Sequence, residues 1–104
     1  MNATDRPKLL FQEPFDERTA FEVSQKGWCG IGIVELPGGE RVRVFFYDPA
    51  RLAQDLETDV KAGDPFIAEP GMIVIPSVTR EYMNEAVSRL YDKGYFKSFI
   101  PLSK

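Results

Sequence analysis

The chain of 104 residues contains no histidine and only one cysteine, Cys29. Histidine is the commonest general base in enzymes and a frequent metal ligand. Its absence excludes Ser-His-Asp and Cys-His catalytic systems and every metal site that needs an imidazole. One thiol closes no disulfide within the chain and builds no zinc site from cysteines alone. The composition therefore predicts no catalytic residues, no metal site and no cofactor, and a reducing environment.

The chain also lacks long apolar runs and an excess of positive charge. No stretch approaches the roughly 20 apolar residues of a membrane-spanning helix, and no apolar segment follows a basic region as in a signal peptide. The formal net charge of −3 disfavours attraction to nucleic acids or to anionic membranes. We therefore expect a cytoplasmic protein that binds neither membranes nor nucleic acids.

Glycines are frequent between residues 27 and 32, but they form no nucleotide-binding motif. The segment reads GWCGIG, which differs from GxGxxG, and the GK[ST] ending of a phosphate loop is missing. Glycines inside a strand more often mark a bulge or a close approach of two backbones. We interpret these glycines in that structural sense.

The most informative pattern is a β-hairpin over residues 28–47 with a glycine pair, Gly38 and Gly39, near its centre. Two glycines suit a two-residue turn because they adopt positive φ without strain. If they are the central residues of the turn, Leu36 faces Arg41 across the hairpin. One face is then almost entirely apolar and is predicted to form the core. Its residues are Cys29, Ile31, Ile33, Val42, Val44 and Phe46, with Glu35 near the turn.

The opposite face of the hairpin is also partly apolar, but it carries arginines. In the predicted register it contains Trp28, Val34, Leu36, Arg41, Arg43, Phe45 and Tyr47. An apolar patch rimmed by charge is typical of an interaction site, where Arg, Tyr and Trp are frequent anchors. We therefore predict an interaction surface formed by Trp28, Arg41, Arg43, Phe45 and Tyr47. The sequence leaves open the alternative that the N-terminal segment of the same chain covers this face.

Two helices are predicted from their caps and apolar spacing. Asp48 followed by Pro49 is typical of a helix start, and Gly63 of a helix end. Thr79 is the expected cap of a second helix, which ends near Gly94. The buried stripes are expected at Leu52, Ala53, Leu56 and Val60 in the first helix and at Met83, Ala86, Val87 and Leu90 in the second.

Further short strands are expected at residues 8–12, 19–24, 72–75 and 96–100. The second of these alternates apolar and polar residues, as an edge strand does, and the third is continuously apolar, as a central strand is. The element order predicts a single domain, residues 1–104, of the α+β class. It would contain a mixed, mostly antiparallel sheet of four to six strands with two helices packed mainly on one face. Residues 1–7 are expected to be frayed.

Several reactive side chains allow other interpretations. Cys29 fits a small buried residue better than a nucleophile, because no cation or base is adjacent to it. Asp55 and Asp59 are i,i+4 neighbours, which is more typical of a solvated helix face than of a Mg²⁺ site. The basic and aromatic residues of 41–47 interleave as in some RNA-binding sheets, but the RNP1 pattern is missing.

These patterns favour a small non-catalytic interaction or regulatory domain. It would self-associate as a homodimer, or bind a protein partner, through the face of the 28–47 hairpin. The alternative is a small ligand-binding protein or enzyme that uses carboxylate and arginine side chains around a pocket. Buried carboxylates converging near Arg41 or Arg43 would support that alternative.

Overall fold

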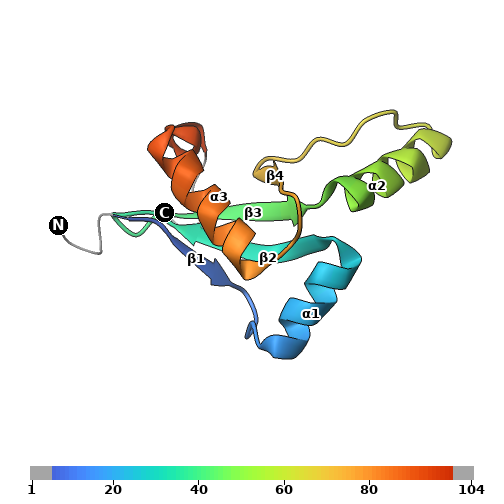
Figure 1. Cartoon of the computed structure of the whole chain (residues 1–104). Coiled ribbons are helices and arrows are strands. Elements are labelled where there is room, and N and C mark those ends of the chain that lie inside the picture. Colours follow the sequence, from blue (N-terminus) through green and yellow to red (C-terminus); the bar gives the residue numbers. More distant parts are fainter. Residues whose placement is uncertain (1–5, 100–104) are drawn as a thin grey trace.

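The computed structural model describes residues 6–99 of the chain, which form an α+β fold as the sequence predicts (Figure 1). The four strands are β1 (Lys8–Phe11), β2 (Trp28–Glu35), β3 (Arg41–Tyr47) and β4 (Met72–Val74). They form one mixed sheet in the order β1-β2-β3-β4, antiparallel except for the parallel pair of β3 and β4. The helices are α1 (Glu17–Lys26), α2 (Pro49–Lys61), α3 (Arg80–Asp92) and the short 3-10 helix η2 (Tyr95–Ser98).

The turn of the hairpin has one residue more than predicted. The Leu36 N–H donates to the Glu40 carbonyl at 2.7 Å, and the Gly39 N–H donates to the Leu36 carbonyl at 2.9 Å. Pro37 therefore joins the glycines in a three-residue loop. Proline suits the second position of such a turn, and Gly38, with a φ of 107°, suits the third. The turn chemistry thus moves the register of the hairpin by one residue.

This shift moves residues 32–35 of β2, and Leu36 just after the strand, to the opposite faces of the sheet from those predicted. Val34 lies opposite Val42 and is fully buried, whereas the predicted register puts it on the face that carries the arginines. Ile33, predicted to be in the core, lies opposite Arg43 and is half-buried. A bulge just after Cys29 shifts the pairing again, so that this residue faces the core as predicted.

The edge strand predicted at residues 19–24 is wrong, because this segment lies within α1. The Asp16 carboxylate caps the helix by accepting a hydrogen bond from the Thr19 N–H at 2.9 Å. Gly27, with a φ of 72°, ends the helix in the left-handed conformation. These two caps outweigh the short apolar alternation on which the strand prediction depended.

The final strand predicted at 96–100 is also wrong. Residues Tyr95–Ser98 form η2, and Ile100 lies outside the described residues. Gly94, with a φ of 80°, turns the chain after α3. Three aromatic rings then pack on one another with centroid distances of 4.9–5.9 Å: Tyr95, Phe96 and Phe99. This local packing takes the place of a strand pairing.

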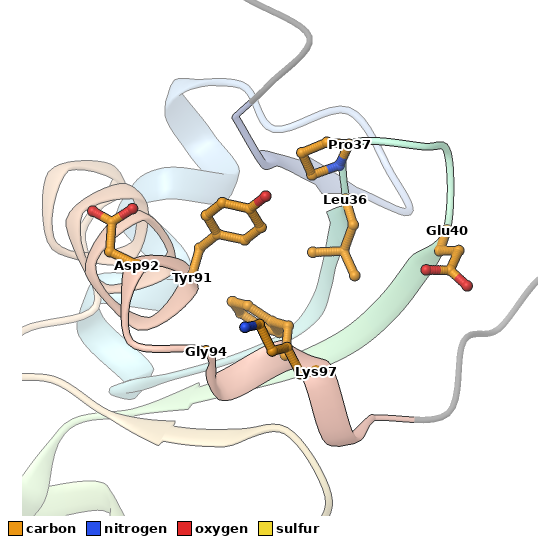
Figure 2. A pocket seen from close by; sticks show the side chains of 8 residues that line it. Leu36, Pro37, Glu40, Tyr91, Asp92, Gly94 and Lys97 are labelled. Carbon is orange, nitrogen blue, oxygen red and sulfur yellow. The ribbon is translucent and has the colours of Figure 1, made fainter.

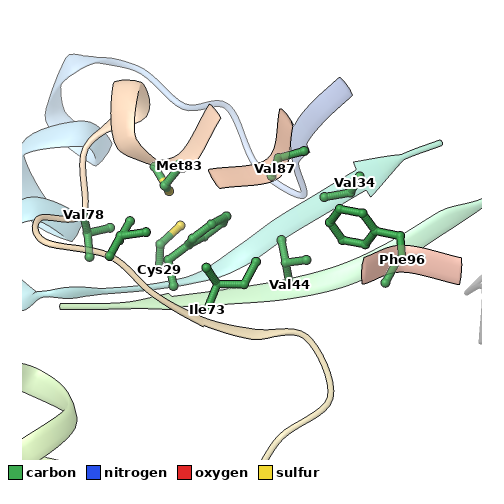
Figure 3. Packing of buried hydrophobic residues seen from close by; sticks show 11 residues of the cluster. Cys29, Val34, Val44, Ile73, Val78, Met83, Val87 and Phe96 are labelled. Atoms are coloured by element: carbon green, nitrogen blue, oxygen red, sulfur yellow. The ribbon is translucent and has the colours of Figure 1, made fainter. Parts of the chain in front are cut away.

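The core lies between one face of the sheet and α3 (Figure 3). Met83 and Val87 of α3 point at the sheet, as the predicted stripe requires, and Phe96 of η2 closes one end. The buried core residues are Cys29, Val34, Val42, Val44, Phe46, Ile73, Ile75, Val78, Met83, Val87 and Phe96. None of the helices in residues 6–99 is long and apolar enough to span a membrane.

Candidate interaction surface

The five residues predicted to form an interaction surface lie on the side of the sheet opposite the core. Arg41, Arg43, Phe45 and Tyr47 alternate along β3 with the buried residues of that strand, and Trp28 of β2 lies directly opposite Tyr47. The extra residue in the turn leaves this set intact, because all but Trp28 are on one strand. The bulge in β2 keeps Trp28 on the same side.

We call this side of the sheet the open face. The register adds further apolar residues to it: Leu10 of β1, Ile33 of β2, and Met72 and Val74 of β4. Leu10, Ile33 and Met72 are half-buried, while Val74 is exposed. The open face thus extends across all four strands and is wider than the hairpin surface predicted from sequence.

The two arginines of the open face have different surroundings. Arg41 forms an ion pair with Glu35 at 3.1 Å. The Arg43 guanidinium lies 5.1 Å from the centroid of the Phe45 ring and has no ion-pair partner within residues 6–99. An arginine stacked on an aromatic ring keeps its N–H groups available for a carboxylate. The N–H groups of Arg43 are therefore available to donate hydrogen bonds to a carboxylate of a partner.

The described part of the N-terminal segment does not cover the open face. β1 extends the sheet at its edge by pairing with β2. Val23 of α1 packs against the core, on the other side of the sheet. The Arg6 side chain also lies on that side, where it donates to Asp92 and Ser88 of α3. The alternative left open by the sequence is thus not realised by residues 6–26.

The first turn of α2 covers one end of the open face. The Asp48 carboxylate caps this helix by accepting from the Arg51 N–H at 2.8 Å. The Arg51 guanidinium lies 5.9 Å from the Trp28 ring and donates to the Lys26 carbonyl at 3.1 Å. Tyr47 packs beside Trp28, with a centroid distance of 6.5 Å, and is only 6% exposed. Trp28 and Tyr47 therefore serve partly to anchor α2.

Beyond this anchor, α2 extends past the end of β3 and away from the sheet (Figure 1). We call α2 and the return segment 62–71 the arm. No residue of α2 is buried, and its predicted stripe is exposed at Leu56 (39%) and Val60 (51%). Phe66 of the return segment is 62% exposed. The radius of gyration, 14.4 Å, exceeds the roughly 13 Å of a compact domain of this size.

The charges of the arm are mainly negative. Arg51 pairs with Asp55 at 3.0 Å, and Lys61 pairs with Glu57 at 3.6 Å. Three further carboxylates of the arm form no ion pair within the described part of the chain: Asp59, Asp64 and Glu69. The arm therefore combines an exposed apolar stripe with an excess of carboxylates.

A cavity of about 400 Å³ lies beside the hairpin turn (Figure 2). It is the candidate site for the alternative in which the protein binds a small ligand. Its lining includes the carboxylates of Glu40 and Asp92 and the ammonium group of Lys97. These three side chains are exposed, and Asp92 is already paired with Arg6 at 2.7 Å. Among residues 6–97, no polar or charged residue is buried. The cavity thus lacks the buried, convergent carboxylates that would support the alternative.

Cys29 is buried, and Asp55 of the acidic pair forms an ion pair within the chain. Cys29 is 1% exposed, and burial raises the pKa of its thiol, which disfavours the reactive thiolate. Asp55 is bound to Arg51 rather than to a site shared with Asp59. Burial, followed by the nearby carboxylates of Glu69 and Asp55, raises the pKa of Tyr47.

Five apolar residues were not predicted from the sequence to lie at this surface: Leu10, Ile33, Met72 and Val74 of the open face, and Phe66 of the arm. The first two depend on strand pairing, which the turn shifts. Phe66 lies between Pro65 and Pro70, and a proline-bounded segment after a helix is a usable sign of a projecting loop.

Comparisons of the chain with protein-family models, with curated proteins and with solved structures find no match.

Proposed function

We propose that the protein is a small non-catalytic interaction domain that binds another protein molecule, a copy of itself or a different partner, through the open face of its sheet. The observation that carries this proposal is the composition of that face. Apolar side chains from all four strands lie on the same face as Arg43, and α2 covers the end of that face near Trp28.

The physical chemistry of the open face supports binding to a protein. Removing apolar surface from water stabilises a complex by roughly 25 cal/mol per Å². Half-buried residues such as Ile33 and Phe45 present apolar surface to a partner while the chain stays folded. An arginine stacked on an aromatic ring combines apolar area with a directed charge, which is common among residues that dominate binding energy. Arg43 and Phe45 are this pair.

The charge distribution supports a protein partner over a nucleic acid or a small molecule. The net charge is −3, and the arm beside the open face is acidic. Carboxylates next to the arginines would repel phosphates. We expect the partner in the cytoplasm, because the only thiol of the chain is buried and unpaired.

Native mass spectrometry of the protein isolated from its own host tests the proposal. We expect a homodimer or a stable complex with a second protein. Arg43→Ala and Phe45→Ala should each weaken that complex, while Arg18→Ala should not, because Arg18 lies on α1 and is 86% exposed. A monomer that carries no partner at any accessible concentration would overturn the proposal.

A further inference from the structure

We infer that the occupant of the open face is the arm of a second copy, so that two chains form a dimer by placing their arms on each other's sheets. This inference deepens the proposed function and rests on it. It joins two features that the fold leaves unpartnered within residues 6–99, namely the open face and the exposed stripe of α2.

The exposure of the arm increases with distance from the sheet. Leu52, Leu56 and Val60 lie one helical turn apart on the same side of α2. Leu52 is half-buried near the anchor, Leu56 is 39% exposed, and Val60 is 51% exposed. Phe66 follows on the return segment at 62%. An apolar stripe of this kind normally packs against a core, and the chain's own core lies on the far side of the sheet.

The charges of the two surfaces are complementary. The open face carries Arg43 and also Lys8, which lies on β1 opposite Glu35. Neither side chain forms an ion pair among the described residues. The arm carries three carboxylates that likewise form no ion pair among the described residues: Asp59, Asp64 and Glu69. Potentials of opposite sign on two apolar surfaces favour their association and set its orientation. Two copies of the acidic arm or two copies of the basic face would instead repel each other.

The dimensions of the two surfaces also agree. An α-helix rises about 1.5 Å per residue, so the part of α2 beyond its anchored first turn, residues 53–61, is roughly 14 Å long. Strands lie about 4.8 Å apart, so the outer strands of a four-stranded sheet are separated by roughly 14 Å. One α2 helix therefore spans the full width of the sheet. Its first turn already lies on the side of the open face, where Arg51 contacts Trp28.

A second copy is the partner that uses both features at once. In a dimer with two-fold symmetry, the contact of the first arm with the second sheet is repeated by the second arm on the first sheet. Both exposed surfaces are then covered in both chains, and the assembly closes. A different protein seated on the open face would leave the stripe of α2 exposed.

Charge reversal on the two surfaces tests the exchange of arms. Arg43→Glu and Asp59→Arg each place two like-charge pairs in the symmetric dimer and should weaken it by about tenfold. Mixing the two variants should restore a heterodimer to near wild-type affinity, because both of its arm–sheet contacts then join opposite charges. A chain with both substitutions should form a homodimer for the same reason. Native mass spectrometry with one variant isotopically labelled counts the three species.

The apolar part of the contact needs a separate variant. Leu56→Ala combined with Val60→Ala should weaken the dimer while leaving the fold intact, because neither residue is buried. Arg18→Ala and Phe21→Ala, on the exposed side of α1, are matched controls that should leave dimerisation unchanged. Circular dichroism confirms that each variant is folded before its association is measured.

The outcomes separate this inference from the proposed function. A wild-type dimer that is weakened by Phe45→Ala but not by either arm variant, or that shows no rescue in the mixture, overturns the exchange of arms and leaves the proposed function standing. The same holds if the open face binds a different protein and no homodimer forms. A monomer without any partner overturns both.

Discussion

The Arg43 guanidinium lies 5.1 Å from the centroid of the Phe45 ring on the open face. The two residues are two positions apart on β3. This contact holds the charge over an apolar ring instead of against a carboxylate. Exposed pairs of this kind contribute about 0.5–1 kcal/mol to folding. Their larger effect is on binding, because the ring and the charge are presented together.

Replacing Arg43 by alanine should therefore separate folding from association. The free energy of unfolding should fall by at most about 1 kcal/mol, whereas association should weaken by about tenfold. Urea unfolding measures the first quantity, and sedimentation equilibrium measures the second. Arg43→Lys keeps the charge but loses the planar stack, and it should give an intermediate affinity. A large loss of stability in Arg43→Ala would show that Arg43 is structural.

Val34 and Ile33 test the register of the hairpin. Val34 is fully buried opposite Val42, so Val34→Ala should lower the free energy of unfolding by about 2–3 kcal/mol. Ile33 is half-buried on the open face, so Ile33→Ala should cost clearly less in a monomeric chain, although isoleucine loses more atoms. Urea titration at concentrations below those that allow dimerisation compares the two. Equal or reversed costs would support the register with a two-residue turn.

Asp16 gives a prediction for pH. The hydrogen bond from the Thr19 N–H lowers the pKa of this carboxyl below its ordinary value of 3.8. A lowered pKa in the folded state means that the stabilisation is complete above the unfolded value and is lost as the pH falls through the folded value. Asp16→Asn keeps a capping oxygen but does not titrate. The wild type should therefore lose stability relative to Asp16→Asn below about pH 4, as measured by urea unfolding at several pH values.

Cys29 should react only when the chain opens. Its thiol is 1% exposed, and burial raises its pKa, so both access and thiolate content are low. Labelling by a thiol reagent in native buffer should be slow and should accelerate with urea in parallel with unfolding. Fast labelling of the native protein would show that the core face near β2 is accessible.

The comparison of sequence with structure shows which signals can be read locally. The cap at Asp48, the stripe at Met83 and Val87, and the alternation of β3 each depend on a few neighbouring residues, and all three are found. The register of β2 depends on whether Pro37 belongs to the turn, and the glycine pair alone does not indicate this. The three-residue turn also places Val34 in the core opposite Val42, and that pairing lies outside any local signal in the sequence.

The position of α2 shows a different limit. Its apolar stripe predicts a helix correctly, but a stripe does not say which surface it covers. Leu56 and Val60 remain exposed in the single chain. Only the three-dimensional position of the anchor at Trp28 shows that α2 leaves the sheet instead of lying across it.

Gly71, where the arm returns to the sheet, should be the least replaceable glycine of the arm. Its φ is 86°, and a Cβ there would collide with the carbonyl oxygen of Arg43. The Gly71 carbonyl also accepts a hydrogen bond from the Phe45 N–H, so the two backbones lie in close contact. Gly63, at the far end of α2, is a matched control, because its φ is 100° but a Cβ would meet nothing within 4 Å. Gly63→Ala should cost about 1 kcal/mol from its conformation alone.

Gly71→Ala should cost more, about 3 kcal/mol, because the backbone of β3 must also move. Since β3 carries Arg43 and Phe45, this variant should weaken association as well, whereas Gly63→Ala should leave it close to wild type. Urea unfolding and sedimentation equilibrium on both variants measure the two effects. Equal costs of unfolding would mean that the return segment does not sit against β3 closely enough to position the open face.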